Sequence, residues 1–190
     1  MLIPRPGIVV VGLLLALMAL CPFAVAQESS TATAQTKSRP PIKTELEGFG
    51  PFVGTWVIDG QWIGGNKLWA KNEYSVGMNG NFIEARTFAK NQYGKIYQRY
   101  LTIWRFNPDK GSVESYGFTY DGTVTVTDSE IDNSDPAHPV IRSQWAQPDG
   151  SRIKQEVRHT DADSYAWKVW SSSDGSDWKL IMDGVWKRQN

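Results

Sequence analysis

The chain has 190 residues, and its 20 Lys and Arg residues balance its 20 Asp and Glu residues, so the formal net charge is zero. This balance excludes the strongly basic surface of a typical nucleic-acid-binding protein. The single cysteine, Cys21, lies in an apolar N-terminal segment, so the rest of the chain has no thiol for a disulfide or a metal site. Its 9 Trp, 7 Tyr and 7 Phe residues supply the apolar area for the core of a single domain.

The first 26 residues have the features of a secretory signal peptide in the right order. Arg5 is their one charge, the run Ile8–Leu20 is uncharged and apolar, and the small-residue triplet Ala24-Val25-Ala26 precedes Gln27. We therefore expect cleavage before Gln27 and export, either to the periplasm or out of the cell.

Two other fates of this segment fit the sequence less well. The apolar run, at about 1.5 Å per residue, covers about 20 Å of a membrane core about 30 Å thick, and Pro22 ends it. A lipoprotein signal would resemble a pattern with a small residue just before the modified cysteine, but Leu20 precedes Cys21. We therefore expect no stable membrane span and no lipid anchor.

Residues 27–43 have the composition of a linker. They contain no aromatic residue, are dominated by Ser, Thr, Gln and Ala, and include Pro40-Pro41. Such a segment buries too little apolar surface to offset its ordering entropy. We expect this segment to be disordered and the folded domain to span residues 44–190.

The folded domain consists of short alternating runs separated by turn sequences. Asn-Gly and Asp-Gly adopt positive φ at little cost, as tight hairpins require. The turns are expected at Gly64-Gly65, Asn79-Gly80, residues 91–94, residues 107–111, Asp121-Gly122, residues 133–139, residues 148–150, residues 161–164 and Asp174-Gly175. An open sheet of so many strands would leave reactive edges, so the pattern predicts an all-β fold, an antiparallel up-and-down β-barrel of about ten strands.

Strand alternation indicates which side chains face the interior of this barrel. In residues 152–160 every second residue is charged, so the alternate set that includes Gln155 and His159 points inward. By the same reasoning Arg99 and Arg105 point outward, and the aromatic residues between them point inward. The expected lumen residues are Tyr74, Tyr100, Trp104, Trp145, Gln155, His159 and Met182.

Alternation predicts which residues of the last strand face inward, but it does not do so for the third strand. In the last strand the inward set should comprise Trp178, Leu180, Met182, Trp186 and Arg188. In the third strand Glu84 and Arg86 share one face, and alternation alone leaves open whether that face is the interior. If it is, the two could begin a general acid/base site, and otherwise they are two outer charges.

The run Phe52-Val53-Gly54-Thr55-Trp56 is expected to open the first strand. Together with an inward arginine in the last strand, it resembles the calycin superfamily and above all the lipocalins. The resemblance implies that Trp56 lies across the closed end of the barrel and that Arg188 packs over it. If the first and last strands pair antiparallel, Arg188 meets Trp56 in a cation–π contact. The chain is most similar to exported bacterial lipocalin-like families of unknown function.

His159 and the tryptophans support two alternative functions. A neutral histidine inside a barrel can ligate haem iron, and the nitrobindins are calycins that do so, although their Gly-rich opening is not matched here. The other interpretation of His159 is a hydrogen-bonded core residue. Trp167 and Trp170 are three residues apart, so a regular strand turns one of them outward, unless a bulge restores the alternation. An exposed Trp would suit a carbohydrate-binding or envelope-binding module.

We conclude from the sequence that the chain is an exported barrel that binds a small, partly apolar molecule in its lumen. We expect binding without chemistry, with no metal, cofactor or nucleic acid involved, and the sequence does not define an oligomeric state. The alternatives are a surface-binding module with exposed tryptophans and, third, a haem-binding or enzymatic barrel that uses His159.

Overall fold

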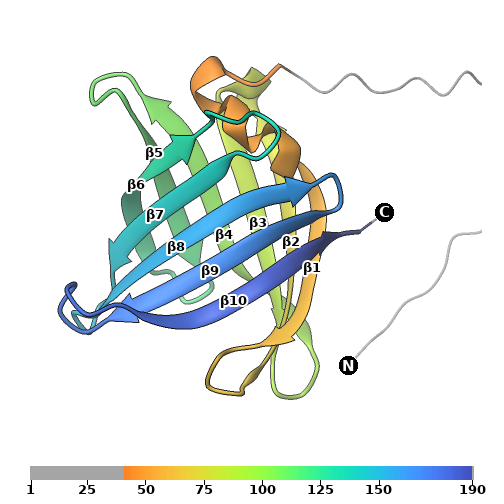
Figure 1. Cartoon of the computed structure of the whole chain (residues 1–190), viewed down its shortest axis with the longest axis vertical. Helices are drawn as coiled ribbons and strands as arrows, with labels where there is room; N and C mark the ends of the chain where they lie inside the picture. The colour runs from red at the N-terminus through yellow and green to blue at the C-terminus, as the bar shows by residue number, and fades with distance from the viewer. Residues whose placement is uncertain (1–40, 190) are drawn as a thin grey trace, which may run out of the picture. The chain divides into compact units, whose positions relative to one another are not determined.

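The computed structural model describes residues 41–189, and these form a closed antiparallel β-barrel (Figure 1). Each strand pairs with its neighbour in the sequence, and β10 pairs with β1 to close the barrel, so the predicted ten-stranded up-and-down fold is confirmed. The strands are β1 (Gly54–Gln61), β2 (Lys67–Gly77), β3 (Phe82–Lys90), β4 (Ile96–Asn107), β5 (Ser112–Thr119), β6 (Val124–Asp132), β7 (Val140–Ala146), β8 (Arg152–Asp161), β9 (Ser164–Ser172) and β10 (Lys179–Arg188). The predicted signal peptide and most of the predicted linker lie outside the described residues.

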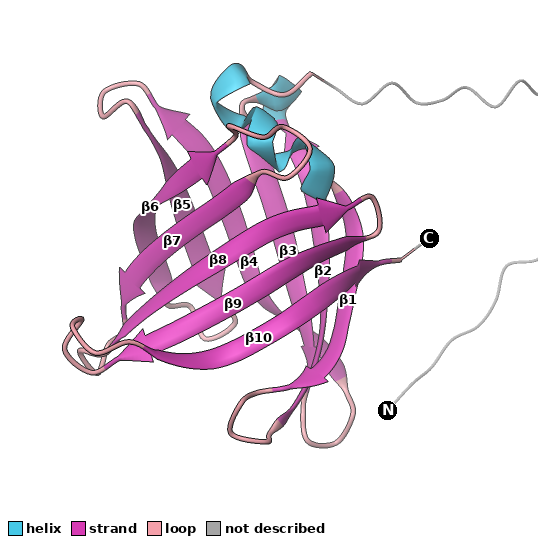
Figure 2. Ribbon diagram, viewed as in Figure 1, coloured by secondary structure: helices cyan, strands magenta, loops and turns pink. Residues whose placement is uncertain are grey.

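A 3-10 helix, η1 (Thr44–Phe52), covers one end of the barrel (Figure 2). The sequence analysis expected no helix and assigned Phe52 to the first strand, so this part of the prediction was wrong. Leu46, Phe49 and Phe52 are three residues apart, which places them on one face of a 3-10 helix, and all three are 0% exposed. No helix among the described residues is long and apolar enough to cross a membrane.

The chain just before η1 also contacts the barrel. Ile42 packs against the core, and the Lys43 backbone N–H donates to the Gly80 carbonyl at 3.0 Å. Gly80 belongs to η2 (Met78–Gly80), a single turn between β2 and β3. The packed part of the chain therefore begins a little before residue 44.

Charged side chains of the strands lie on the outer wall of the barrel. On β7, Arg142 pairs with Glu156 at 3.0 Å and with Glu130 at 3.1 Å. Glu84 and Arg86 also pair on the outside, at 2.7 Å, while the alternate residues of β3 are buried. The orientation that alternation left open is thus settled, and Glu84 and Arg86 do not form an interior acid/base pair.

Two bulges shift the strand alternation. The β10 register shifts between Leu180 and Met182, so Met182 is buried while Leu180 pairs with the outward Trp170. The register between β3 and β4 shifts next to Thr87. Arg99 and Tyr100 were expected on opposite faces of β4, but the Arg99 Nε donates to the Tyr100 hydroxyl at 2.8 Å. A single extra residue reverses the faces of all residues beyond it, which explains both errors of the prediction.

Candidate functional site

The closed end of the barrel is organised by Arg188. Its guanidinium lies 4.1 Å from the centre of the Trp56 ring, and Trp56 and Arg188 are register partners across β1 and β10. Gly54 has φ +134°, and a Cβ there would lie 2.5 Å from an Arg188 nitrogen, so only glycine fits at this approach.

Arg188 also holds η1 to the barrel. Its Nη2 and Nη1 donate to the carbonyls of Pro51 at 3.0 Å and Val53 at 3.1 Å. Its Nε donates to the Ala162 carbonyl at 2.7 Å, in the turn between β8 and β9. One side chain therefore connects the end of the helix, the last strand and a turn.

Beneath η1, the upper lumen is packed with aromatic side chains. The Phe52 ring contacts those of Tyr74, His159 and Tyr165 at centroid distances of 6.2, 5.7 and 5.4 Å. Trp104 stacks on Tyr74 and is 6% exposed. Burial raises the pKa of Tyr74 to about 12, against a smaller lowering by hydrogen bonds. Three of the predicted lumen residues, Tyr74, Trp104 and His159, thus lie in this packed half.

His159 is a buried polar group that bonds to the backbone. Its Nδ1 lies 2.8 Å from the Ala137 carbonyl, so Nδ1 carries the proton and Nε2 is left as an acceptor. Nε2 is buried and has no hydrogen-bond partner among the described residues. No group of three or more His, Cys, Asp or Glu side chains within residues 41–189 is arranged to hold a metal ion.

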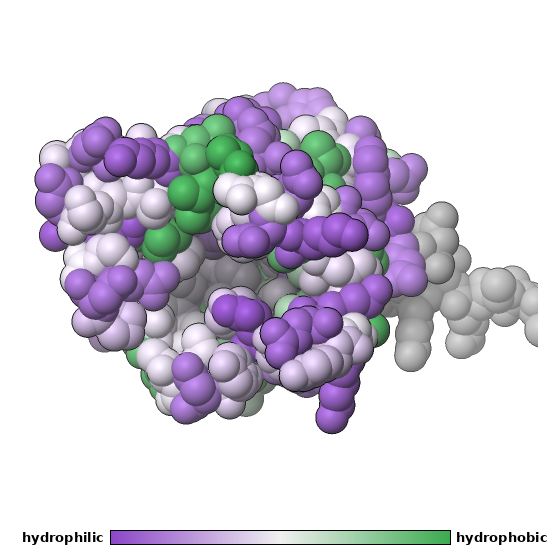
Figure 3. All heavy atoms as spheres, turned by 90° about the horizontal axis from the view of Figure 1, so that it is seen from below, coloured by the Kyte–Doolittle hydropathy of each residue, from purple (hydrophilic) through white to green (hydrophobic). Residues whose placement is uncertain are grey.

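The lower lumen differs because several large inward side chains there are only half-buried. Trp145, Gln155 and Trp167 all face inward by register and keep part of their surface in contact with solvent. The Trp167 Nε1 donates to the Gln155 Oε1 at 3.2 Å, which fixes the amide against the ring. Figure 3 shows this end from below, with hydrophilic and hydrophobic side chains around a hollow.

The other two predicted lumen residues lie at different depths. Met182 is 1% exposed and lies on the inner face of β10 beside Val169, its register partner on β9. Tyr100 is 36% exposed and lies at the rim with Arg99 and Tyr97, whose hydroxyl accepts from the Arg99 Nη1 at 3.3 Å. The predicted residues therefore do not form one cluster.

Trp62 is a lumen residue that the sequence analysis missed. It follows β1, is half-buried, and its ring lies 5.9 Å from that of Trp167. The signal was present, because Trp62 continues the inward alternation of Trp56 and Ile58.

Trp170 lies on the outer wall, three residues beyond the inward Trp167. The Lys154 Nζ lies 5.3 Å from the centre of the Trp170 ring and 4.5 Å from that of Trp178. The β9 register is continuous, so no bulge within β9 turns Trp170 inward. Trp178, expected inside, belongs to this outer cluster.

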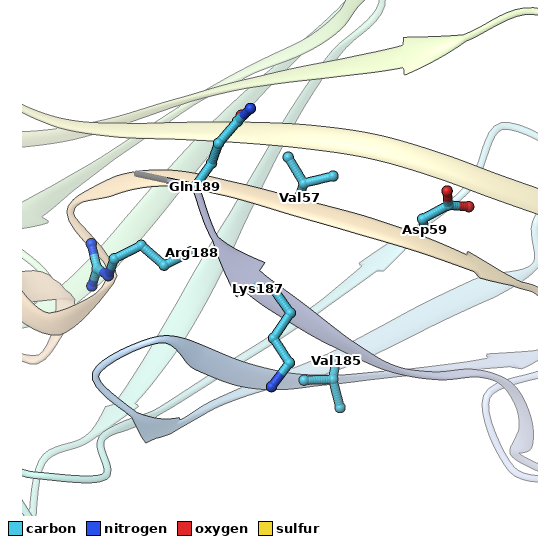
Figure 4. A pocket seen from close by; sticks show the side chains of 6 residues that line it. All are labelled: Val57, Asp59, Val185, Lys187, Arg188 and Gln189. Atoms are coloured by element: carbon cyan, nitrogen blue, oxygen red, sulfur yellow. The ribbon is translucent and has the colours of Figure 1, made fainter.

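A second depression, a groove of about 390 Å³, lies on the outer face of the seam between β1 and β10 (Figure 4). Its lining includes Val57 and Asp59 from β1 and Val185 and Lys187 from β10. The inward Ile58 is 3% exposed and fills the lumen side of the seam. The groove is therefore separate from the lumen.

The comparisons with known proteins concern the fold alone. No family model matches the sequence, and no curated protein matches it. The crystal structure of Rv2717c from M. tuberculosis is similar to this chain, with a TM-score of 0.58 and 12% sequence identity. The match covers 79% of this chain and 100% of that one. The chain thus shares with Rv2717c the fold of a closed antiparallel β-barrel.

Proposed function

We propose that this protein is an exported binding protein that holds a small, partly apolar molecule in the lower half of its lumen. This proposal rests on a difference in solvent exposure between inward side chains at the two ends of the barrel. Beneath η1 the inward Trp104, His159 and Tyr165 are buried, whereas the inward Trp145, Gln155 and Trp167 are reached by solvent. A concave site lined by aromatic rings with a few polar groups is the usual form of a small-molecule pocket.

The outward orientation of Glu84 and Arg86 supports binding over catalysis, because these two were the acid/base pair that the sequence suggested. Glu84 and Arg86 pair on the outer wall, and the Phe52 ring packs edge-on against His159. A haem or a substrate would have to displace this packing to reach the His159 Nε2. We therefore place the binding site nearer to the open end.

Trp167 and Trp170 form a matched pair for testing the location of the site. They are the same residue type on the same strand, but Trp167 faces the lumen and Trp170 faces outward. We expect Trp167→Ala to weaken the binding of the neutral fluorophore N-phenyl-1-naphthylamine at least ten-fold, and Trp170→Ala to leave it unchanged. A loss caused by Trp170→Ala alone would support the carbohydrate-binding or envelope-binding alternative.

Native mass spectrometry of the protein purified from its own host would detect the natural occupant. We expect a bound organic mass that is absent from the Trp167→Ala protein. A Soret band in the absorption spectrum would instead support the haem alternative.

Export is tested separately by locating the full chain after cell fractionation and sequencing its N-terminus. We propose a mature chain that begins at Gln27, in the periplasmic or secreted fraction. A protein that keeps an acylated Cys21 would instead be a lipoprotein.

A further inference from the structure

The charges of the barrel are distributed unequally between its two surfaces. Apart from Arg99, Lys179 and Arg188, the inward-facing residues of the described strands include no Asp, Glu, Lys or Arg, while the outer wall carries ion pairs such as Lys71–Glu73 at 2.6 Å. Arg188 contacts the lumen at the closed end, whereas Arg99 and Lys179, the register partner of Ser171, are exposed at the open rim. A charged group placed deeper in the lower lumen would therefore have no buried counter-charge, and an unpaired charge removed from water is costly.

The lower lumen also has two chemically different walls. One carries large rings, those of Trp62, Trp145 and Trp167, and we call it the tryptophan wall. The other wall, on β3 to β6, is built of small residues, and we call it the hydroxyl wall. Its inward members are Thr87, Thr102, Ser115, Thr125, Thr127 and Ser129.

Part of the hydroxyl wall lacks protein partners. The Ser129 hydroxyl lies 2.9 Å from that of Ser143, but no side-chain hydrogen bond to the described residues is made by Thr102 or Thr125. These two threonines are separated by Gly117, which pairs with both and leaves space between them. Their hydroxyls are half-buried and free to bond to a molecule in the lumen.

We propose that the lumen selects an uncharged aromatic molecule that bears a hydroxyl or similar polar group. Its ring lies against the tryptophan wall, and its polar group bonds to Thr102 and Thr125. This inference rests on the proposed lumen function and specifies its ligand class. Amines of the same shape are rejected because no inward carboxylate of the described strands lies there, and acids because the nearest cations, Lys179 and Arg99, are exposed to water at the rim.

Four indole compounds of nearly equal size test this charge selection. They are tryptophol, 3-ethylindole, indole-3-acetate and tryptamine, which differ in carrying a hydroxyl, no polar group, a carboxylate and an ammonium. We expect isothermal titration calorimetry to show tryptophol binding at least ten-fold more tightly than either charged compound.

The double variant Thr102→Val/Thr125→Val removes both hydroxyls and keeps the side-chain shape. We expect it to weaken tryptophol binding about ten-fold and to leave 3-ethylindole binding unchanged. Thr55→Val, on the outward face of β1, is the matched control and should change neither.

Other results of these titrations would show whether the proposed ligand class fails alone or together with the proposed lumen function. If indole-3-acetate binds most tightly and Arg99→Gln or Lys179→Gln removes that advantage, a rim cation selects an anion and the neutral class is overturned, while the lumen function stands. Equal binding of all four compounds overturns the class in the same way. If none of the four binds, both the class and the lumen function are overturned.

Discussion

At the end covered by η1, Phe49, Phe52 and Trp56 are each 0% exposed, whereas at the opposite end Trp62 and Trp167 remain half-buried. Both ends use aromatic rings, but those of the closed end are fully buried beneath a helix, whereas Trp167 packs against the same core and is only partly buried. The difference indicates that the closed end stabilises the fold and the open end is available for binding. Substitutions at the closed end should therefore mainly lower the free energy of unfolding, and substitutions at the open end should mainly lower ligand affinity.

The largest effect is expected from truncating the central ring of the closed end. Trp56→Ala removes a fully buried side chain and the partner of Arg188, and should cost about 3 to 5 kcal/mol of unfolding free energy. Trp62→Ala at the open end should cost about 1 kcal/mol, because its ring is only half-buried. Urea denaturation measures both, and equal losses would contradict the division between the two ends.

A smaller loss is expected when Arg188 is replaced by lysine. Arg188→Lys keeps a positive charge near Trp56 but cannot reproduce the bonds to Pro51, Val53 and Ala162. We expect a loss of about 1 to 3 kcal/mol with little change in probe affinity. The measurement is urea denaturation beside a binding titration, and a large change in affinity would show that the two ends are coupled.

The buried Tyr74 should make the closed end sensitive to alkaline pH. Burial raises its pKa to about 12 from 10.0, so the folded protein keeps a proton that the unfolded chain releases. The corresponding stability is complete below pH 10.0 and is lost as the pH rises towards about 12. We expect Tyr74→Phe to reduce this loss in thermal denaturation scans, while Tyr93→Phe, at an exposed open-end turn, leaves it unchanged.

The smallest effect concerns a carboxylate on the outer wall near the closed end. Hydrogen bonds from Lys110 at 2.7 Å, and from Asn107, Tyr116 and Arg105, lower the pKa of Glu114 to about 2 from 4.5. The contribution of the ionised Glu114 to the free energy of unfolding is therefore present above pH 4.5 and is lost as the pH falls towards about 2.

We expect Glu114→Gln to flatten the acid limb of the stability curve, measured by urea midpoints between pH 5 and pH 2. Glu84→Gln is the control, because Glu84 forms a more exposed pair. An identical acid limb in the parent and in Glu114→Gln would contradict the assignment.

Several features of the fold were predictable from local sequence. Turn residues such as Asp121-Gly122 divided the chain into ten strands, and Gly122 has the positive φ, +86°, that a tight hairpin needs. Alternation in β8 indicated that Gln155 and His159 point inward, because charges occupy every other position. These features depend on neighbours within one strand or one turn, so a local pattern is sufficient.

The helix over the barrel was harder to predict. Pro51 and two glycines, Gly48 and Gly50, weaken its helical pattern, and its stability comes from Leu46, Phe49 and Phe52 packing into the barrel. Its only local signal is their spacing of three, which is easily overlooked in so short a segment. Packing against distant strands, rather than propensity, fixes this element.

The sequence by itself determined the all-β class, the strand number and which residues alternate together. The tertiary structure decided that Glu84 and Arg86 face outward, that bulges displace Arg99 and Leu180 from their expected faces, and how deep each inward residue lies. Alternation has a period of two and carries no information about depth, which depends on the register between strands and on the cover supplied by η1. This is why His159 and Gln155 shared one predicted lumen, although His159 is buried in the packed half of the barrel and Gln155 is reached by solvent.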